Sequence, residues 1–422
     1  ASLPASASFS QRIGLLARSS PVLQKVGQIL ARDKRLPEEL RSYLRELECL
    51  APMVPQEVLE QAIELELGPL DRIGFTIEPA IAEASVAVVV PFRCDSREGG
   101  VTSTLGVLKV LKPGIEQQLD DELALLDQVG QQLDSRCDEL NIPSLDYQDA
   151  FQQAHVKLLD EVHLENEQRH LSEAKEFFAQ EPRVQIPRLF EHCTKRVTSM
   201  ERLTGGKVTD HGLMGERQKR QLAGLIGEAL IAGPVFSRKD RPIFHGDPHA
   251  GNLFFTDEGR LGILDWSLAG RLDARDRTTI VQIALAAVML DARSVAERLA
   301  QLGNGKEPDP MILKSVAEQW VQRVVHGQFP GLSWLVGMLD DAVLRAQLRV
   351  ADDFMLFRKS LLTLEGVVSD VGERTGLIDR TLNMEFLRHF AKELPQRWMY
   401  PPSSRSFATQ LSNFDITHAI LG

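Results

Sequence analysis

The sequence segment that says most about the fold of this chain is His245-Gly246-Asp247-Pro248-His249-Ala250-Gly251-Asn252. Asn252 follows Asp247 by five residues, and Pro248 and Gly251 lie between them. Proline and glycine favour a loop over a helix, so the segment predicts a loop that holds an acid and an amide at a fixed separation. Taken alone, such a segment could equally be an ordinary surface turn, so its meaning depends on the residues around it.

A second carboxylate follows this loop. Asp265 comes thirteen residues after Asn252 and ends the apolar run 261–264, which predicts a short strand. Phosphoryl transfer from ATP needs a positioned metal ion, a positioned acceptor and neutralised charge. The interval between Asp247 and Asn252 equals that between the base and the metal-binding asparagine of a protein-kinase catalytic loop. A carboxylate at a strand end can hold Mg²⁺ against phosphate oxygens. The three residues together predict a site for ATP and Mg²⁺.

Such a site also needs a lysine on a strand, to bind the α- and β-phosphates. Residues 85–90 (SVAVVV) and 104–110 (TLGVLKV) are short and β-branched, and they predict two strands joined by a turn at 96–100. Lys109 lies in the second strand. Without the loop described above it would be read as an ordinary strand-end lysine, but with the loop present the functional interpretation is favoured.

A helix must supply the glutamate that orients this lysine. The pattern predicts one long helix over about 147–178, and Glu161, Glu165 and Glu167 all lie on it. After that helix, residues 184–186 and 197–200 are predicted to form another strand pair.

The order of the predicted elements indicates an α+β fold in two lobes. The pattern is helical from residue 11 to about 67, and helices dominate from residue 204 onward. The clearest late helix has apolar residues at steps of three and four, at Phe354, Phe357, Leu361, Leu364 and Val368. We therefore divide the chain into an N-terminal helical extension (1–70), an N-lobe with a small sheet (71–203) and a helical C-lobe with the catalytic and metal-binding loops (204–422).

Composition excludes several other classes of protein. The chain has 422 residues, of which 43% are hydrophobic and 25% charged, and its formal charge of −11 argues against a broad nucleic-acid surface. Residues 280–290 form the most apolar helical candidate, and they are too few to cross a bilayer, so we expect a core helix.

The chain begins with Ala1 rather than Met. This is compatible with processing, or with a shortened chain from which membrane segments are missing.

Alternative metal chemistry is disfavoured. A zinc site from His245 and His249 would need a helix that aligns both rings, and Pro248 between them breaks a helix. The cysteines form no closely spaced pair and are expected to be reduced thiols; they are Cys49, Cys94, Cys137 and Cys193.

Several ordered motifs together resemble the UbiB family of atypical kinases, also called aarF-domain kinases. The matching segments are Lys25-Val26-Gly27-Gln28 (the family's K-x-G-Q), Ala82-Glu83-Ala84-Ser85 (its alanine-rich loop), the Lys109 strand ending in Pro113-Gly114, Ile186-Pro187-Arg188-Leu189 with Met200-Glu201 (its hinge strand), the loop 245–252, and Leu364-Glu365-Gly366-Val367. The resemblance covers roughly residues 22–370. It implies an atypical protein-kinase-like fold whose N-terminal extension lies over the active site.

The resemblance also implies roles for individual residues. Lys109 would pair with Glu167, and Lys25 would face Glu161. Asp247 would be the catalytic base or its remnant, while Asn252 and Asp265 would hold Mg²⁺. The residues implied to contact the nucleotide are Ala84, Ser85, Lys109, Met200, Glu201, Leu203 and Gln28.

Four features depart from the family pattern. His163 stands where an aspartate is expected, Val88 replaces a glutamine, and Glu83 replaces an alanine of the alanine-rich loop. Trp266-Ser267 replaces the Phe-Gly that follows the metal-binding aspartate. The lysine, the asparagine and both aspartates of the core set are present, so ATP binding is expected.

Three functions are compatible with these residues. The first is a Mg-ATP-dependent atypical kinase or ATPase of the UbiB type, which the resemblance links to isoprenoid-quinone (coenzyme Q) lipid synthesis. The second is a small-molecule phosphotransferase of the aminoglycoside or choline kinase type, which lacks the K-x-G-Q and alanine motifs. The third is a non-catalytic nucleotide-gated scaffold. The first implies ATP and Mg²⁺, a lipid or quinone-precursor ligand, and a cytoplasmic location with peripheral membrane contact.

Overall fold

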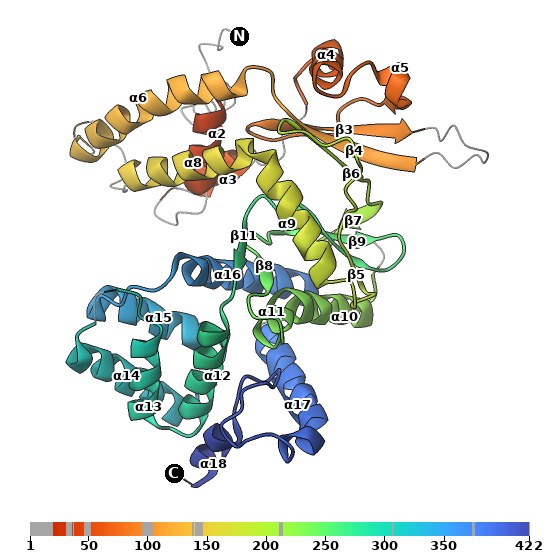
Figure 1. Ribbon diagram of the computed structural model, residues 1–422. Helices are drawn as coiled ribbons and strands as arrows, with labels where there is room; N and C mark the ends of the chain where they lie inside the picture. The colour runs from red at the N-terminus through yellow and green to blue at the C-terminus, as the bar shows by residue number, and fades with distance from the viewer. Residues whose placement is uncertain are drawn as a thin grey trace. The chain divides into compact units, whose positions relative to one another are not determined.

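The computed structural model describes residues 20–30, 36, 38–45, 52–94, 104–136, 139, 147–210, 214–305, 308–373 and 376–421. The turn predicted at 96–100 lies outside the described residues. The chain forms two compact units, the first comprising Ala1–Ser172 and Pro187–Leu203 and the second Glu173–Ile186 and Thr204–Gly422 (Figure 1). Both mix helices with short sheets, which agrees with the α+β fold predicted. The domain boundaries predicted at residues 70 and 203 stay predictions.

The first unit is built on a five-stranded antiparallel sheet with the order β1-β3-β4-β6, to which β2 adds by pairing with β3. Its strands are β1 (Phe75–Ile77), β2 (Ala82–Glu83), β3 (Ala87–Cys94), β4 (Thr104–Leu111) and β6 (Val197–Glu201). Side chains alternate between the two faces of a strand. Val88, Leu108 and Val110 therefore enter a hydrophobic core on one face, while Lys109 projects from the other.

Helices cover this sheet and form a second core beside it. The helices are α2 (Pro21–Leu30), α3 (Glu38–Arg45), α4 (Gln56–Leu67), α5 (Leu70–Ile73), α6 (Ile115–Ser135), α8 (Tyr147–Val162) and α9 (Leu164–Phe177), the last of which continues into the second unit. Leu59 and Ile63 of α4 pack on the sheet core. Val22 and Val26 fix α2 to a cluster that includes Leu119 of α6 and Leu158 of α8.

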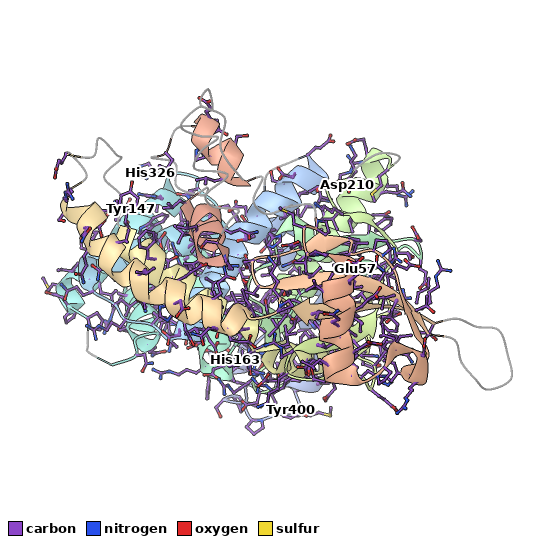
Figure 2. The ribbon with its side chains drawn as sticks, turned by 90° about the horizontal axis from the view of Figure 1, so that it is seen from above. Glu57, Tyr147, His163, Asp210, His326 and Tyr400 are labelled. Atoms are coloured by element: carbon purple, nitrogen blue, oxygen red, sulfur yellow. The ribbon has the colours of Figure 1, made fainter. Side chains whose placement is uncertain are left out.

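The single helix predicted over 147–178 is wrong, because the chain breaks between α8 and α9 at His163, which Figure 2 labels. The His163 amide donates to the Asp160 carbonyl at 3.3 Å, three residues back, and so leaves the α-helical pattern. Leu164 then enters the core formed by α2, α6 and α8. Six residues of unbroken helix would turn a side chain by roughly 240°. The break therefore gives Glu161 and Glu167 directions that one straight helix would not.

The second unit contains two small sheets. The first has the order β5-β10-β9-β7 and the second pairs β11 with β8. The strands are β5 (Val184–Gln185), β7 (Gly205–Lys207), β8 (Ile243–His245), β9 (Leu253–Thr256), β10 (Leu261–Ile263) and β11 (Ala269–Arg271). The strand pair predicted from 184–186 and 197–200 is wrong. β5 lies parallel to β10 in this unit, and β6 lies antiparallel to β4 in the first unit. Both segments are strands, but their partners are distant in the sequence.

Helices make up the rest of the second unit. They are α10 (Glu216–Gly227), the π-helix η2 (Glu228–Ala232), α11 (Gly233–Val235), the 3₁₀ turn η3 (Ala250–Asn252), α12 (Ala274–Val288), α13 (Ala292–Gln301), α14 (Pro310–Val325), α15 (Leu332–Ala346), α16 (Asp352–Gly372), α17 (Leu377–Arg397) and α18 (Asn413–Leu421). The helix predicted from the apolar residues Phe354 to Val368 is confirmed as α16, and these residues are buried. The apolar run 280–290 falls largely within α12 and contributes to the core. Within the described residues no helix has both the length and the apolar character needed to cross a membrane.

Candidate active site

In the first unit, Lys109 and Glu167 form an ion pair with Nζ and Oε2 2.7 Å apart. Their side chains are only 13% and 4% exposed. Removing both charges from water costs free energy that their attraction must offset, so this pair is weak evidence for stability. It does fix the lysine ammonium at the sheet surface. Gln168, next to Glu167, donates to the Thr198 hydroxyl at 3.0 Å and so holds α9 against β6.

A second carboxylate of the first unit, Glu161, joins three elements. Its Oε1 pairs with the Lys25 ammonium of α2, and its Oε2 accepts the Ser85 hydroxyl at 2.8 Å. The Lys25 and Glu161 side chains are 15% and 21% exposed. The structure thus places the K-x-G-Q helix against the end of α8, as the resemblance implies. The turn after β2 joins them through Ser85, which the sequence analysis did not predict. The Gln28 side chain lies outside the described residues.

The turn that contains Ala84 is anchored by a contact that the sequence did not reveal. The Ala84 amide donates to the Ala87 carbonyl at 2.8 Å. Glu83, the acid that departs from the alanine motif, pairs with Lys112 at 2.8 Å and accepts the Met53 amide at 2.6 Å. Burial acts to raise the Glu83 pKa, but the Lys112 and backbone hydrogen bonds outweigh it and lower that pKa. An acid inserted among alanines was itself a signal that a nearby cation should exist.

The hinge residues lie where β6 meets the segment before it. Met200 is paired with Val107 of β4 and bridges to Leu189. The Glu201 amide donates a hydrogen bond to the Arg188 carbonyl at 2.8 Å, and a Glu201 carboxylate oxygen accepts one from the Arg188 amide at 3.1 Å. These contacts fix the strand end, with Leu203 two residues beyond it. Their role in nucleotide binding stays a prediction.

In the second unit, His245 is buried and organises the loop that follows it. Its Nδ1 accepts the Asp247 amide at 3.2 Å, so Nε2 must carry the ring proton that is donated to the Leu264 carbonyl at 2.9 Å. Burial lowers the pKa of the ring, which keeps it neutral. Ser360 of α16 donates to the His245 carbonyl at 2.8 Å. With both nitrogens engaged, His245 does not serve the zinc site considered above.

Asp247 and Asn252 lie at the two ends of this loop. The Asn252 amide nitrogen donates to the Asp247 carbonyl at 3.1 Å, which assigns the side-chain oxygen as the atom that can bind a cation. The backbone carbonyl of Asn252 accepts a hydrogen bond from the Leu264 backbone amide at 2.8 Å, so the loop is fixed to the residue just before Asp265. His249 Nδ1 caps the turn by accepting the Gly251 amide at 3.1 Å.

Asp265 adopts a backbone conformation that few residues tolerate. Its φ is 51°, in the left-handed region, where aspartate and asparagine are enriched among the non-glycine residues. Its Oδ1 accepts the Ser267 amide at 3.3 Å. The next residue, Trp266, is fully buried, and its ring meets the edge of His245 at 4.8 Å between centroids. Trp266, which stands where the resemblance expects a phenylalanine, is therefore a core residue.

The oxygen donors of Asn252 and Asp265 fit a hard cation such as Mg²⁺, which takes one or two protein oxygens and completes its shell with water and phosphate. Among the residues that the structure describes, no group of three or more His, Cys, Asp or Glu side chains could hold a metal ion on its own.

Comparison with known proteins agrees with this geometry. The model of the ABC1 atypical kinase-like domain matches residues 46–299, more than half of the chain, so the chain belongs to that family. It is 28% identical to the Arabidopsis thaliana chloroplastic protein ACTIVITY OF BC1 COMPLEX KINASE 1, over 84% of this chain and 52% of the relative. It is 26% identical to the probable protein kinase UbiB of Tolumonas auensis, over 82% of this chain and 64% of the relative. The chain thus spans about half to two thirds of the length of these relatives.

A solved structure supports the fold alone. The Mycobacterium tuberculosis protein Rv3197, determined in complex with erythromycin, superposes with a TM-score of 0.52 at 19% identity, over 86% of this chain and 91% of that one.

Proposed function

We propose that this chain binds Mg-ATP and transfers or hydrolyses its γ-phosphoryl group, as an atypical kinase or ATPase of the UbiB type. The observation that carries the proposal is the buried Lys109–Glu167 pair, 2.7 Å long, in a chain that also ties Asn252 and Asp247 into one loop. A buried ion pair contributes little net stability. The presence of this pair is explained better by the need for a positioned ammonium group.

Each residue has a separate task in this proposal. Lys109, oriented by Glu167, binds the α- and β-phosphates. Asn252 and Asp265 would hold Mg²⁺, which when bound neutralises developing charge on the phosphate oxygens. The Asp247 carboxylate would accept the proton of the attacking hydroxyl or water.

The biological role proposed is support of isoprenoid-quinone lipid synthesis, with a lipid or quinone-precursor ligand, a cytoplasmic location and peripheral membrane contact. The support is the likeness to proteins named UbiB. The K-x-G-Q helix, fixed near Ser85 through Glu161, argues against a small-molecule kinase of the aminoglycoside or choline type. The departures at His163 and Trp266 keep a nucleotide-gated scaffold as the second candidate.

ATP turnover in the presence and absence of lipid vesicles tests the proposal. Wild-type protein should release phosphate from Mg-ATP, and the Lys109→Met variant should lose most of that activity. Lys175→Met is the matched control, because Lys175 is exposed on the same helix as Glu167. Nucleotide binding without turnover, with or without lipid, would favour the scaffold instead.

A further inference from the structure

The second unit contains a cavity that none of the residues assigned above lines. It measures about 300 Å³ and lies among α12, α15, α16, α17 and the π-helix. Side chains that define its walls include Val281, Ala284, Trp334 and Phe357. The four come from α12, α15 and α16, so the cavity is built by the tertiary packing of this unit.

The walls are almost entirely apolar. Among the described residues, the polar side chains in the walls are Asp379, Asn383 and the indole of Trp334. The indole N–H already donates a hydrogen bond to the Trp320 carbonyl at 2.8 Å, so it is not free for a ligand. Protein interiors are normally packed without voids much larger than water, and an empty apolar cavity forfeits the contacts of every wall atom. Filling the cavity with water is disfavoured too, because away from Asp379 and Asn383 the walls offer water no polar side-chain partners. An apolar occupant removes both costs.

The size sets the scale of that occupant. A cavity of about 150 Å³ lined by apolar side chains binds one benzene molecule. The present cavity is twice as large, which corresponds to roughly a dozen carbon atoms. Val288 and Phe329, which also line it, are 58% and 53% exposed. They mark an apolar entrance from solvent.

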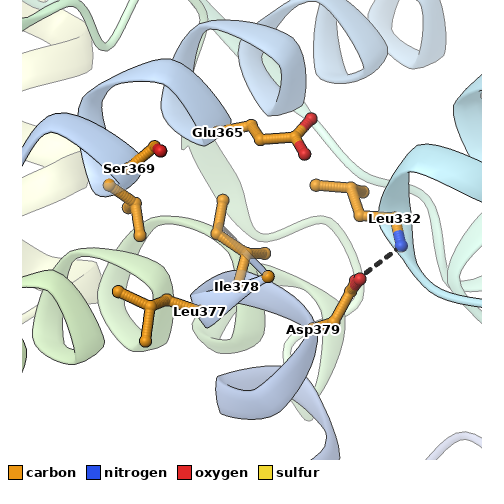
Figure 3. A pocket seen from close by; sticks show the side chains of 8 residues that line it. Leu332, Glu365, Ser369, Leu377, Ile378 and Asp379 are labelled. Carbon is orange, nitrogen blue, oxygen red and sulfur yellow. Dashed lines mark hydrogen bonds between the residues drawn. The ribbon is translucent and has the colours of Figure 1, made fainter. Parts of the chain in front are cut away.

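The polar pair defines one end of the cavity. Asp379 and Asn383 are four residues apart on α17, so they lie on the same face of the helix. Figure 3 looks into a smaller pocket that Asp379 and Leu332 also line, and it draws the hydrogen bond between them. The Asp379 carboxylate accepts the Leu332 amide there at 2.6 Å. Gly331 allows this approach, because a Cβ there would meet the Asp379 carboxylate at 2.3 Å. Carboxylate oxygens accept hydrogen bonds, so this end suits a group that donates one.

We propose that the cavity binds an apolar molecule of roughly a dozen carbon atoms that carries one hydroxyl group. The hydroxyl donates to the Asp379 carboxylate beside Asn383, and the hydrocarbon part lies among the side chains of α12, α15 and α16. The site is separate from the proposed nucleotide site, because Asp247, Asn252 and Asp265 do not line the cavity.

Primary alcohols of six to fourteen carbons provide the test, with binding followed by calorimetry. Affinity should rise with each added methylene and stop rising near twelve carbons, when the cavity is full. Ala284→Phe, which places a ring in the cavity, should weaken binding at least tenfold. Ala391→Phe, at an exposed position of α17 that does not line the cavity, should leave binding unchanged.

A fluorescence measurement keeps the test decisive if Ala284→Phe fails to fold. In a Trp398→Phe background, which removes an indole that is 90% exposed, 10-bromo-1-decanol should quench Trp334 in a saturable way. Trp334→Phe should remove most of that quenching. Affinity that rises with chain length without limit, quenching that does not saturate, or an Ala284→Phe protein that binds like wild type would overturn the proposal.

Discussion

Asp265 joins a carboxylate to a left-handed backbone, with φ at 51°. Asparagine tolerates this conformation as well as aspartate does, so Asp265→Asn changes the ligand charge and leaves the backbone unstrained. We expect the variant to fold and to lose Mg-ATP-dependent activity by on the order of 1,000-fold, equivalent to several kcal/mol of lost metal-ion stabilisation. Phosphate release and circular dichroism measure the two effects.

The control for this variant is Asp257→Asn, which alters an exposed aspartate in the turn after β9. It should behave as wild type. Wild-type turnover in Asp265→Asn would refute the metal assignment.

His245 makes stability depend on pH. Because burial lowers its folded-state pKa, the unfolded chain takes up a proton below about pH 6.5 while the folded chain does not. Stability due to the neutral ring is therefore lost as pH falls below that value, by up to about 1.4 kcal/mol per pH unit. The pKa of His389 is also lowered by burial, so both rings contribute.

The two histidines are separated by substitution. His245→Asn should lose less stability than wild type between pH 6.5 and 5 in thermal unfolding, whatever its stability at pH 7.5. An unchanged slope in this variant would mean that His245 is not held neutral.

The residues of the candidate site were largely predictable, and their supporting contacts were not. The Lys109–Glu167 and Lys25–Glu161 pairs follow from motif order, and the structure forms both. The Lys112 partner of Glu83 was missed. An ion pair of this kind depends on the tertiary arrangement of strands and turns. A local sequence pattern does not specify which residues that arrangement brings together.

At the scale of elements, α2 is held by two different kinds of contact. Val22 and Val26 anchor it in the core, and Lys25 pairs with Glu161. Lys25→Ala should therefore leave α2 docked while removing a charge-assisted hydrogen bond, of the kind worth roughly 1.5–3 kcal/mol.

We expect Lys25→Ala to change ATP affinity or turnover by about tenfold, and it could also permit self-phosphorylation. Nucleotide titration and phosphate release are the measurements. Leu23→Ala, on the exposed side of the same helix, is the matched control and should have little effect. ATP binding and turnover that match wild type in Lys25→Ala would exclude a role for the K-x-G-Q helix in the site.

Elements themselves were predicted better than their partners. β4 and α16 appear in the segments predicted for them, and β3 overlaps its predicted segment 85–90 but runs from Ala87 to Cys94. β5 and β6 exist as strands but belong to different sheets. Strand propensity is local, whereas pairing is decided by contacts far apart in the sequence. The helix break at His163 was not predicted either, because it also depends on contacts far apart in the sequence. Leu164 departs from the axis of α8 and packs into a core formed by other helices.

For the whole molecule, nucleotide binding should appear as added stability. A ligand that binds only the folded state at 100 times its dissociation constant adds about 2.7 kcal/mol. For units of this size that corresponds to a rise of several degrees in unfolding temperature. Mg-ATP should produce this rise in wild type. ATP with a chelator should produce a smaller one, and an equal rise in the two conditions would count against Mg²⁺ in the site.

Helix α16 takes part in two features of the second unit. Phe357 and Leu361 line the apolar cavity, while Ser360 between them holds the His245 carbonyl, and the Phe357 ring meets Phe244 at 5.1 Å. A molecule that fills the cavity and shifts this helix would, through the Ser360 hydrogen bond, also shift the backbone that presents Asp247. An inhibitor directed at the cavity would consequently lower the maximal rate without competing with ATP, and raising the nucleotide concentration would not reverse it.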